Sequence, residues 1–199
     1  MLRIALTGGI ATGKSYVLEQ LRRRGVPCLD SDSLVHGITS AGTEAAAAIA
    51  ARFGADILAR DGSVDRAKLG PVVFADPAAR ADLERIVHPA VYRAIEAGLR
   101  GFERMGDVPF AVVDVPLLYE TGAADTFDRV VVTACPSELQ LARLRERGMG
   151  DVEARQRLAA QWPTDEKASR ADFVIATDGT FDDTNRQIDA VVNALRSHT

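Results

Sequence analysis

Hydrophobic residues along this chain come in short runs separated by longer amphipathic stretches. The runs are nearly continuous rather than alternating, which is typical of strands buried on both faces of a parallel sheet. Five such runs occur, at Leu2–Leu6, Val26–Asp30, Pro109–Pro116, Phe127–Ala134 and Ala171–Thr177. The pattern predicts an α/β fold, with a five-stranded parallel sheet and flanking helices.

The amphipathic stretches predict the helices. The first begins near Lys14 and stops at Gly25, and the last covers Asp182–Arg196. The long stretch 33–107 contains no convincing strand, and a second helical stretch covers 136–169. Helices are predicted in the first of these stretches at Glu44–Phe53, Arg66–Phe74 and Pro77–Arg104. We therefore expect a core made of 1–32, 108–144 and 170–199, with 33–107 as a helical insert that carries substrate specificity.

Composition excludes several classes of protein. The chain has 199 residues and a formal net charge of −4, which argues against a nucleic-acid partner. No apolar run reaches the length of a membrane span and no signal peptide is visible, so we expect a cytoplasmic protein without a membrane partner. Cys28 and Cys135 lie in or beside strand-like runs, which favours reduced core residues. Composition does not decide the oligomeric state.

The segment "LTGGIATGKS" follows the first strand and opens the first helix. Gly8, Gly13, Lys14 and Ser15 satisfy the P-loop pattern G-x-x-x-x-G-K-[ST]. Glycines let backbone N–H groups approach phosphate oxygens, and the helix N-terminus favours the same anion. Lys14 would bridge the outer phosphates and Ser15 would ligate Mg²⁺. The motif predicts a nucleoside triphosphate site without deciding between a kinase, a GTPase and an ATP-driven machine.

Carboxylates follow two of the predicted strands. Asp30 and Asp32 end the second strand, where an acid can accept a proton from an attacking hydroxyl or hold Mg²⁺ through water. Both also suit a helix N-cap. Asp114 ends the third strand and resembles the acid of a Walker B strand. Which of the three shapes a metal shell stays open.

Other candidates have both a functional and a structural interpretation. Arg143 and Arg147 are four residues apart on one helix face, so they either approach phosphates or form a solvated surface. "PLLYE", Pro116–Glu120, is either core or the apolar wall of an acceptor pocket. His88, in "HPAV", is either structural or a substrate contact, and Gln161 fits a surface helix equally well.

Taken together, these segments resemble the dephospho-CoA kinase family over nearly the whole chain. "LTGGIATGKS" resembles LTGGIGSGKS, "LDSDSLVH" resembles the family's DAD element, and "DGSVDRAKLGPVVF" resembles DG-x-x-x-R-x-x-L-x-x-x-x-F. "HPAV" and "PLLYE" resemble HP-x-V and PLLFE. Arg143, Arg147, Gln161 and "ADFVI" follow at the expected places.

The resemblance implies a P-loop kinase core, a CoA-binding helical domain and a mobile lid at about 145–169. It implies transfer of the ATP γ-phosphate to the ribose 3′-hydroxyl of dephospho-CoA, with Mg²⁺. Lys14, Arg143 and Asp32, the last as the base, would be catalytic. The nucleotide site would comprise Gly8, Gly9, Ile10, Ala11, Thr12, Gly13, Lys14, Ser15, Tyr16 and Arg147, with Ser15 on the metal. The acceptor would contact Asp32, His88, Pro116, Leu117, Leu118 and Glu120.

Alternatives remain another P-loop small-molecule or nucleoside kinase, or a regulatory GTPase. The GTPase is disfavoured because the chain has no N-K-x-D motif and no convincing D-x-x-G at a strand end.

The chain departs from the family pattern at three places. Ala11-Thr12 replaces Gly-Ser, which we expect to be tolerated provided that Ala11 does not need a positive φ. Ser31 replaces Ala in the DAD element. Thr177 replaces an Asn after the last strand, which puts in doubt any adenine or lid contact carried over to that position.

Overall fold

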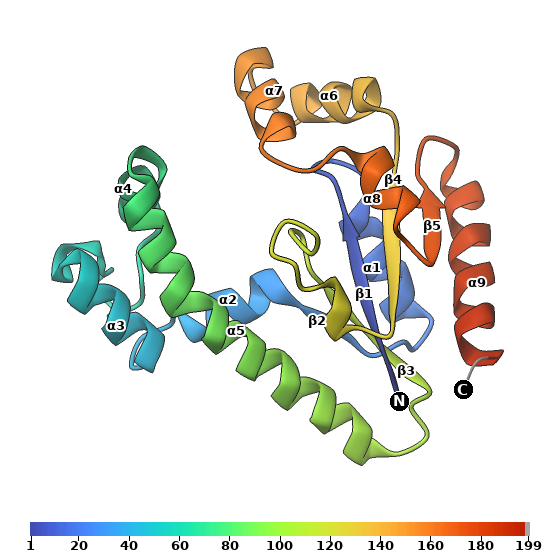
Figure 1. The fold of residues 1–199 in the computed structure, drawn as a ribbon, viewed down its shortest axis with the longest axis horizontal. Coiled ribbons are helices and arrows are strands. Elements are labelled where there is room, and N and C mark those ends of the chain that lie inside the picture. The colour runs from blue at the N-terminus through green and yellow to red at the C-terminus, as the bar shows by residue number, and fades with distance from the viewer. Residues whose placement is uncertain (198–199) are drawn as a thin grey trace. The chain divides into compact units, whose positions relative to one another are not determined.

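The computed structural model describes residues 1–197 and confirms the parallel α/β sheet (Figure 1). The strands are β1 (Leu2–Gly8), β2 (Cys28–Asp30), β3 (Phe110–Asp114), β4 (Arg129–Ala134) and β5 (Phe173–Ala176). They lie side by side in the order β2-β3-β1-β4-β5, so β1 is central. Leu6 is in register with Asp114 on one side and with Val131 on the other. The carboxyl ends of β1, β3 and β4 therefore lie together at one edge, where the P-loop begins.

The described residues contain nine α-helices, of which α1 to α8 lie between strands and α9 follows β5. They are α1 (Lys14–Arg23), α2 (Ser31–Ile38), α3 (Glu44–Phe53), α4 (Arg66–Ala75), α5 (Pro77–Met105), α6 (Ser137–Glu146), α7 (Asp151–Ala159), α8 (Thr164–Ser169) and α9 (Phe181–Ser197). The helical stretch 136–169 consists of three helices. Gly148, which has a positive φ, lies just after α6, and Pro163 is the N-cap of α8. Short 3₁₀ turns occupy Ala55–Ile57 and Ala124–Thr126.

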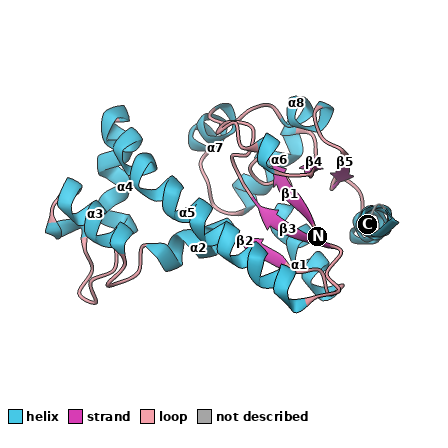
Figure 2. Ribbon diagram, turned by 60° about the horizontal axis from the view of Figure 1, so that its bottom comes forward, coloured by secondary structure: helices cyan, strands magenta, loops and turns pink. Residues whose placement is uncertain are grey.

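Side chains alternate between the two faces of the sheet, and both faces are covered (Figure 2). Ile4 and Leu6 pack with residues of α1 and α9, in a cluster that includes Val17, Ile188 and Leu195. On the opposite face, Ala5 packs with residues of β4 and of the loop after β3, and a residue of α8 packs against this cluster. Covering both faces accounts for the nearly continuous apolar runs of the strands.

The chain forms two compact units, 1–29 with 101–199 and 30–100. The second unit is helical and has its own apolar cluster, centred on Ile49, Ile57 and Leu69. Local caps define its helices: Thr43 accepts a hydrogen bond from the Ala46 N–H at the start of α3, and Gly54 with φ of 94° ends it. Among the described residues, no helix is long and apolar enough to cross a lipid bilayer.

Candidate active site

The P-loop turns from β1 into α1 in a conformation that restricts its residue types. Gly13 has φ of 84° as the residue before α1, so it fills a left-handed position that favours glycine. At Gly8, a Cβ would collide with the hydroxyl of Thr133 and lie 2.7 Å from Thr12 Oγ1. The first glycine of the motif is therefore required by close packing and the second by backbone conformation.

We expected Ala11 to be tolerated only if it did not need a positive φ, and the structure does not meet this condition. Its φ is 60°, a left-handed conformation that costs an L-residue with a Cβ about 1–2 kcal/mol. The Ala11 side chain is also buried, in a cluster with Leu144 and Ala154. The strained loop position is thus coupled to packing against α6 and α7.

Threonine hydroxyls support the loop from the sheet side. Thr12 Oγ1 donates to the carbonyl of Gly9 at 2.8 Å and lies 2.8 Å from Thr133 Oγ1. Thr177 Oγ1 donates to the carbonyl of Thr12 at 2.7 Å. Thr12 and Thr133 are fully buried and Thr177 is nearly so. Thr177, which the sequence marks only as a departure, therefore holds the P-loop backbone.

Arg143 lies against the P-loop rather than on a solvated face. Its Nη1 donates to the Ala11 carbonyl at 3.1 Å and to Thr177 Oγ1 at 3.2 Å. Its Nη2 donates to the Thr177 carbonyl at 2.5 Å. One guanidinium thus joins the loop to the segment after β5, and the surface interpretation of Arg143 is wrong.

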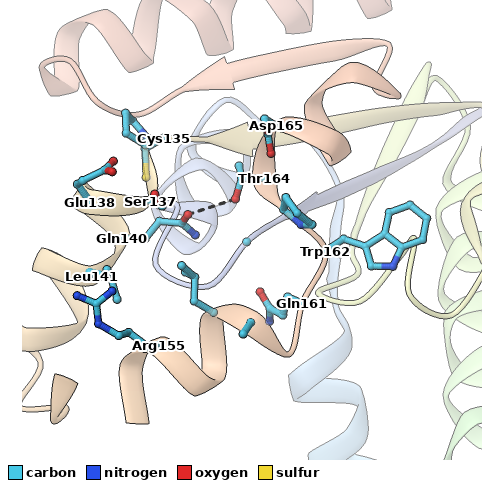
Figure 3. Close-up of a pocket in the computed structure, with 15 residues that line it drawn as sticks. Cys135, Ser137, Glu138, Gln140, Leu141, Arg155, Gln161, Trp162, Thr164 and Asp165 are labelled. Carbon is cyan, nitrogen blue, oxygen red and sulfur yellow. Dashed lines mark hydrogen bonds between the residues drawn. The ribbon is translucent and has the colours of Figure 1, made fainter. Parts of the chain in front are cut away.

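Two glutamines hold the peptide groups of Ile10, from α6 and from the segment between α7 and α8. Gln140 Nε2 donates to the Ile10 carbonyl at 2.6 Å, and the Ile10 N–H donates to Gln161 Oε1 at 2.8 Å. Thr164 Oγ1 donates to Gln140 Oε1 at 3.3 Å. Figure 3 shows these side chains around a cavity of about 920 Å³, which is lined by α6, α7 and α8 and by Gly9. Gln161 therefore lies outside the helices and contacts the P-loop.

Lys14, at the start of α1, forms an ion pair with Asp114, at the end of β3. The ammonium contacts Asp114 Oδ1, and the two side chains are 15% and 7% exposed. Lys14 begins α1 and Asp114 ends β3, so the parallel register of β1 with β3 brings these residues together. The acid at the end of β3 thus lies beside the P-loop lysine.

A second cavity, of about 490 Å³, opens beside the loop. Ala11, Gly13 and Tyr16 line it from the P-loop and α1, and Arg143 and Arg147 line it from α6. The segment after β5 completes it with Thr177, Gly179, Thr180, Phe181 and Thr184. The Tyr16 ring lies 4.7 Å from the Phe181 ring, and its hydroxyl accepts from Asn185. The volume lies in the range of small-molecule binding sites.

The remaining sequence candidates divide into two groups. In the helical unit, Asp30 is the N-cap of α2 and accepts from the N–H groups of Asp32 and Ser33, whereas the Asp32 side chain is exposed. His88 lies on α5 at an apolar cavity of about 290 Å³ between α2, α3, α4 and α5. The structure thus supports capping for Asp30.

In the loop after β3, Pro116 is half-buried and Leu117 is 42% exposed. The other two residues expected to contact the acceptor, Leu118 and Glu120, have partners within the protein. Leu118 is 0% exposed, and its side chain packs into the sheet core. Glu120 pairs with buried Lys167, a residue that no sequence signal marks.

Both cysteines are free and shielded. Burial raises the pKa of the Cys28 thiol to about 12, and burial also raises the pKa of Cys135. Neither thiol is therefore a ready nucleophile at neutral pH. Within residues 1–197, no three His, Cys, Asp or Glu side chains gather as a metal cage.

A central β1 that leads through a glycine-rich loop into α1, with a lysine and a carboxylate beside it, is the arrangement of the P-loop class of proteins. A family model described as dephospho-CoA kinase matches residues 2–183. The chain belongs to the dephospho-CoA kinase family and is a kinase.

Individual relatives agree. The chain is 47% identical over 194 residues to the dephospho-CoA kinase of Anaeromyxobacter dehalogenans, covering 97% of this chain and 92% of the relative. It is 49% identical over 192 residues to that of Geobacter metallireducens, covering 96% and 95%. The solved structure of dephospho-CoA kinase from Campylobacter jejuni superposes with a TM-score of 0.75 at 26% identity, over 98% of both chains.

Proposed function

We propose that this enzyme transfers the γ-phosphate of ATP to the ribose 3′-hydroxyl of dephospho-CoA, which gives coenzyme A and ADP, the last step of coenzyme A synthesis. The observation that carries the proposal is the P-loop of a dephospho-CoA kinase family member, with Lys14 held beside Asp114. Another small-molecule kinase or a GTPase is not favoured.

The nucleotide would occupy the P-loop and the cavity of about 490 Å³. The N–H groups of residues 8–16 would surround the phosphates, and Lys14 would neutralise charge on the β- and γ-phosphates. Arg143 and Arg147 line the cavity, where a guanidinium can stabilise phosphate charge or stack on a base. Tyr16 and Phe181 offer aromatic surface for the adenosine.

The donor set at the start of α1 fits Mg²⁺ bound together with ATP. Ser15 stands in the first turn of α1, and Asp114 ends the strand beside it. Mg²⁺ takes few protein ligands and completes its shell with phosphates and water, so the lack of a protein cage within the described residues agrees with this chemistry. When bound, the ion would neutralise charge on the transferred phosphoryl group.

The acceptor would be held by the helical unit. Asp32 is exposed at the start of α2, free to accept the 3′-hydroxyl proton as the oxygen attacks the γ-phosphorus and ADP leaves. The apolar cavity of about 290 Å³, with His88 at its wall, suits the pantetheine chain. Pro116 and Leu117 would add acceptor contacts from the loop after β3.

The same proposal covers the domains and the setting. The core would comprise 1–32, 108–144 and 170–199, the acceptor insert 33–107 and the lid 145–169. We place the reaction in the cytoplasm, with ATP and dephospho-CoA as partners and without nucleic acid.

A coupled ADP-release assay tests this function. Purified protein with ATP and Mg²⁺ is offered dephospho-CoA, adenosine and shikimate, and Lys14→Ala serves as the control for contaminating activity. We expect equal amounts of ADP and coenzyme A from dephospho-CoA alone, with ATP preferred over GTP. Turnover of another acceptor without turnover of dephospho-CoA contradicts the acceptor, and strong preference for GTP contradicts the nucleotide.

A further inference from the structure

A fully buried lysine lies in the core unit, away from the P-loop. The side chain of Lys167, on α8, is 0% exposed, and its Nζ lies 2.7 Å from Glu120 Oε1 in the loop after β3. Among the described residues, neither Lys167 Nζ nor Glu120 Oε2 has a hydrogen-bond partner of good geometry. The lysine's charge is thus balanced by one carboxylate at a buried position.

Stability alone is a poor explanation for such a pair. The desolvation of two charges largely cancels their attraction, and apolar replacements of a buried pair are often neutral or stabilising. A buried ion pair is better explained where the geometry that it fixes matters. The question is therefore what Glu120 holds besides the ammonium of Lys167.

The same oxygen, Glu120 Oε1, accepts a hydrogen bond from the backbone N–H of Trp162 at 3.0 Å. The Trp162 ring stacks on Tyr119 with centroids 5.9 Å apart and planes within 10°. The guanidinium of Arg170 covers the Trp162 ring at 4.7 Å. Burial raises the pKa of Tyr119. Residue 162 is thus fixed through both its backbone and its ring.

The residue before Trp162 reaches the P-loop. Gln161 Oε1 accepts from the Ile10 N–H at 2.8 Å. Two residues beyond Trp162, Thr164 donates to Gln140, which in turn donates to the Ile10 carbonyl. Figure 3 shows Gln140, Gln161 and Thr164 on the walls of the same cavity. Both peptide groups of Ile10 therefore depend on where the segment 161–164 lies.

We propose that Glu120 is a positioning residue for the nucleotide site. Its carboxylate, neutralised by Lys167, holds the N–H of Trp162 and so sets Gln161 against Ile10. Ile10 precedes Ala11, whose left-handed conformation must be maintained by its surroundings. A P-loop fixed beforehand loses less conformational freedom when it binds phosphates, so the pair strengthens ATP binding from a distance.

This inference rests on the proposed function only for the identity of the nucleotide, so its test needs no acceptor. ATP binding with Mg²⁺ is measured by calorimetry for two double variants without either charge. Glu120→Gln/Lys167→Met keeps a side-chain oxygen for the Trp162 N–H, whereas Glu120→Leu/Lys167→Met does not. A matched control, Glu153→Leu/Arg157→Met, removes an exposed ion pair of 2.8 Å on α7.

We expect the Gln/Met variant and the control to bind ATP within about threefold of the unchanged protein. The Leu/Met variant should bind about tenfold more weakly, the scale of one or two lost hydrogen bonds. Trp162 is the single tryptophan of the chain, so its fluorescence reports on the junction directly. The emission should move to longer wavelength in the Leu/Met variant only.

Equal ATP affinities for the two double variants would overturn the proposal and leave the pair a structural one. If the Leu/Met variant does not fold, Gln161→Ala provides the test, because it removes the last contact and leaves the buried pair intact. We expect about fivefold weaker ATP binding with unchanged tryptophan emission. Unchanged affinity in that variant would refute the connection to the P-loop. Failure to phosphorylate dephospho-CoA would affect the proposed function and not these comparisons.

Discussion

Removing the Arg143 side chain should loosen the P-loop and slow phosphoryl transfer at once. In Arg143→Ala, the carbonyls of Ala11 and Thr177 lose a charged donor, as does the hydroxyl of Thr177. That hydroxyl is also the group that holds the Thr12 carbonyl. The substitution therefore acts on the loop and on the segment after β5 together.

The three contacts give the size of the effect. A net contribution of about 1 kcal/mol for each hydrogen bond gives a loss of about 3 kcal/mol in the free energy of unfolding. For a chain of this length, about 1 kcal/mol corresponds to about 2–4 °C, so the Tm should fall by about 6–12 °C. Turnover should fall by about a hundredfold or more because guanidinium stabilisation of the transferred phosphate is lost, while the KM for the acceptor stays unchanged.

Calorimetry gives the Tm, and the coupled ADP-release assay gives kcat and KM. Arg145→Ala is the matched control, because Arg145 lies on the same helix but pairs with the exposed Asp151. A surface pair contributes less than about 1 kcal/mol, so the control should lose no more than about 4 °C and keep its turnover. If Arg143→Ala melts like this control and turns over normally, the contacts of Arg143 do not support the loop and our reasoning is refuted.

Three further changes test other parts of the site. Asp32→Asn should lower kcat by about 10²–10⁴-fold with ATP affinity unchanged, measured by steady-state kinetics and calorimetry, and an unchanged kcat would exclude Asp32 as the base. Ala11→Gly should change the free energy of unfolding, measured by urea titration, by less than about 1 kcal/mol. The relief of backbone strain offsets the loss of a buried methyl group and the greater flexibility of the unfolded chain. A loss of more than about 2 kcal/mol would contradict the backbone strain at Ala11. The pKa of Cys28 is about 12 in the folded protein, against 9.0 ordinarily, so iodoacetamide at pH 8 should modify Cys28 only after unfolding. Mass spectrometry measures the modification, and rapid modification of the native protein would contradict the burial of Cys28. Since this pKa is raised by folding, the thiol's contribution to stability is complete below about pH 9 and is lost as the pH rises towards 12.

The sequence predicted those parts of the structure that depend on neighbours in the chain. The helix at Glu44–Phe53 was predicted with its observed bounds, because a Thr43 cap and Gly54 mark its ends locally. The five apolar runs became the five strands, and for β1, β3 and β4 the reason is again local, since burial on both faces leaves an apolar pattern in each strand separately.

Parts of the site that depend on residues far apart could not be predicted in this way. Arg143 and Ala11 are 132 positions apart, and nothing in the composition of either segment signals their contact. Lys167 looks like one more charge on a polar helix, yet it is buried against Glu120. Leu118 belongs to an apolar motif that fits core and pocket equally, and only the packing of the sheet decides for the core.

The threonines under the P-loop limit how freely this loop could be exchanged between proteins. The side chain of Thr12 meets that of Thr133, and its carbonyl meets the hydroxyl of Thr177, so three distant segments share one arrangement of hydroxyl groups. Grafting a GGIGSGKS loop into this chain would remove the buried methyl of Thr12 and leave a small void among the unchanged partners. A graft that also exchanges positions 133 and 177 should be tolerated better. The residues that must change together at this site therefore extend beyond the P-loop motif.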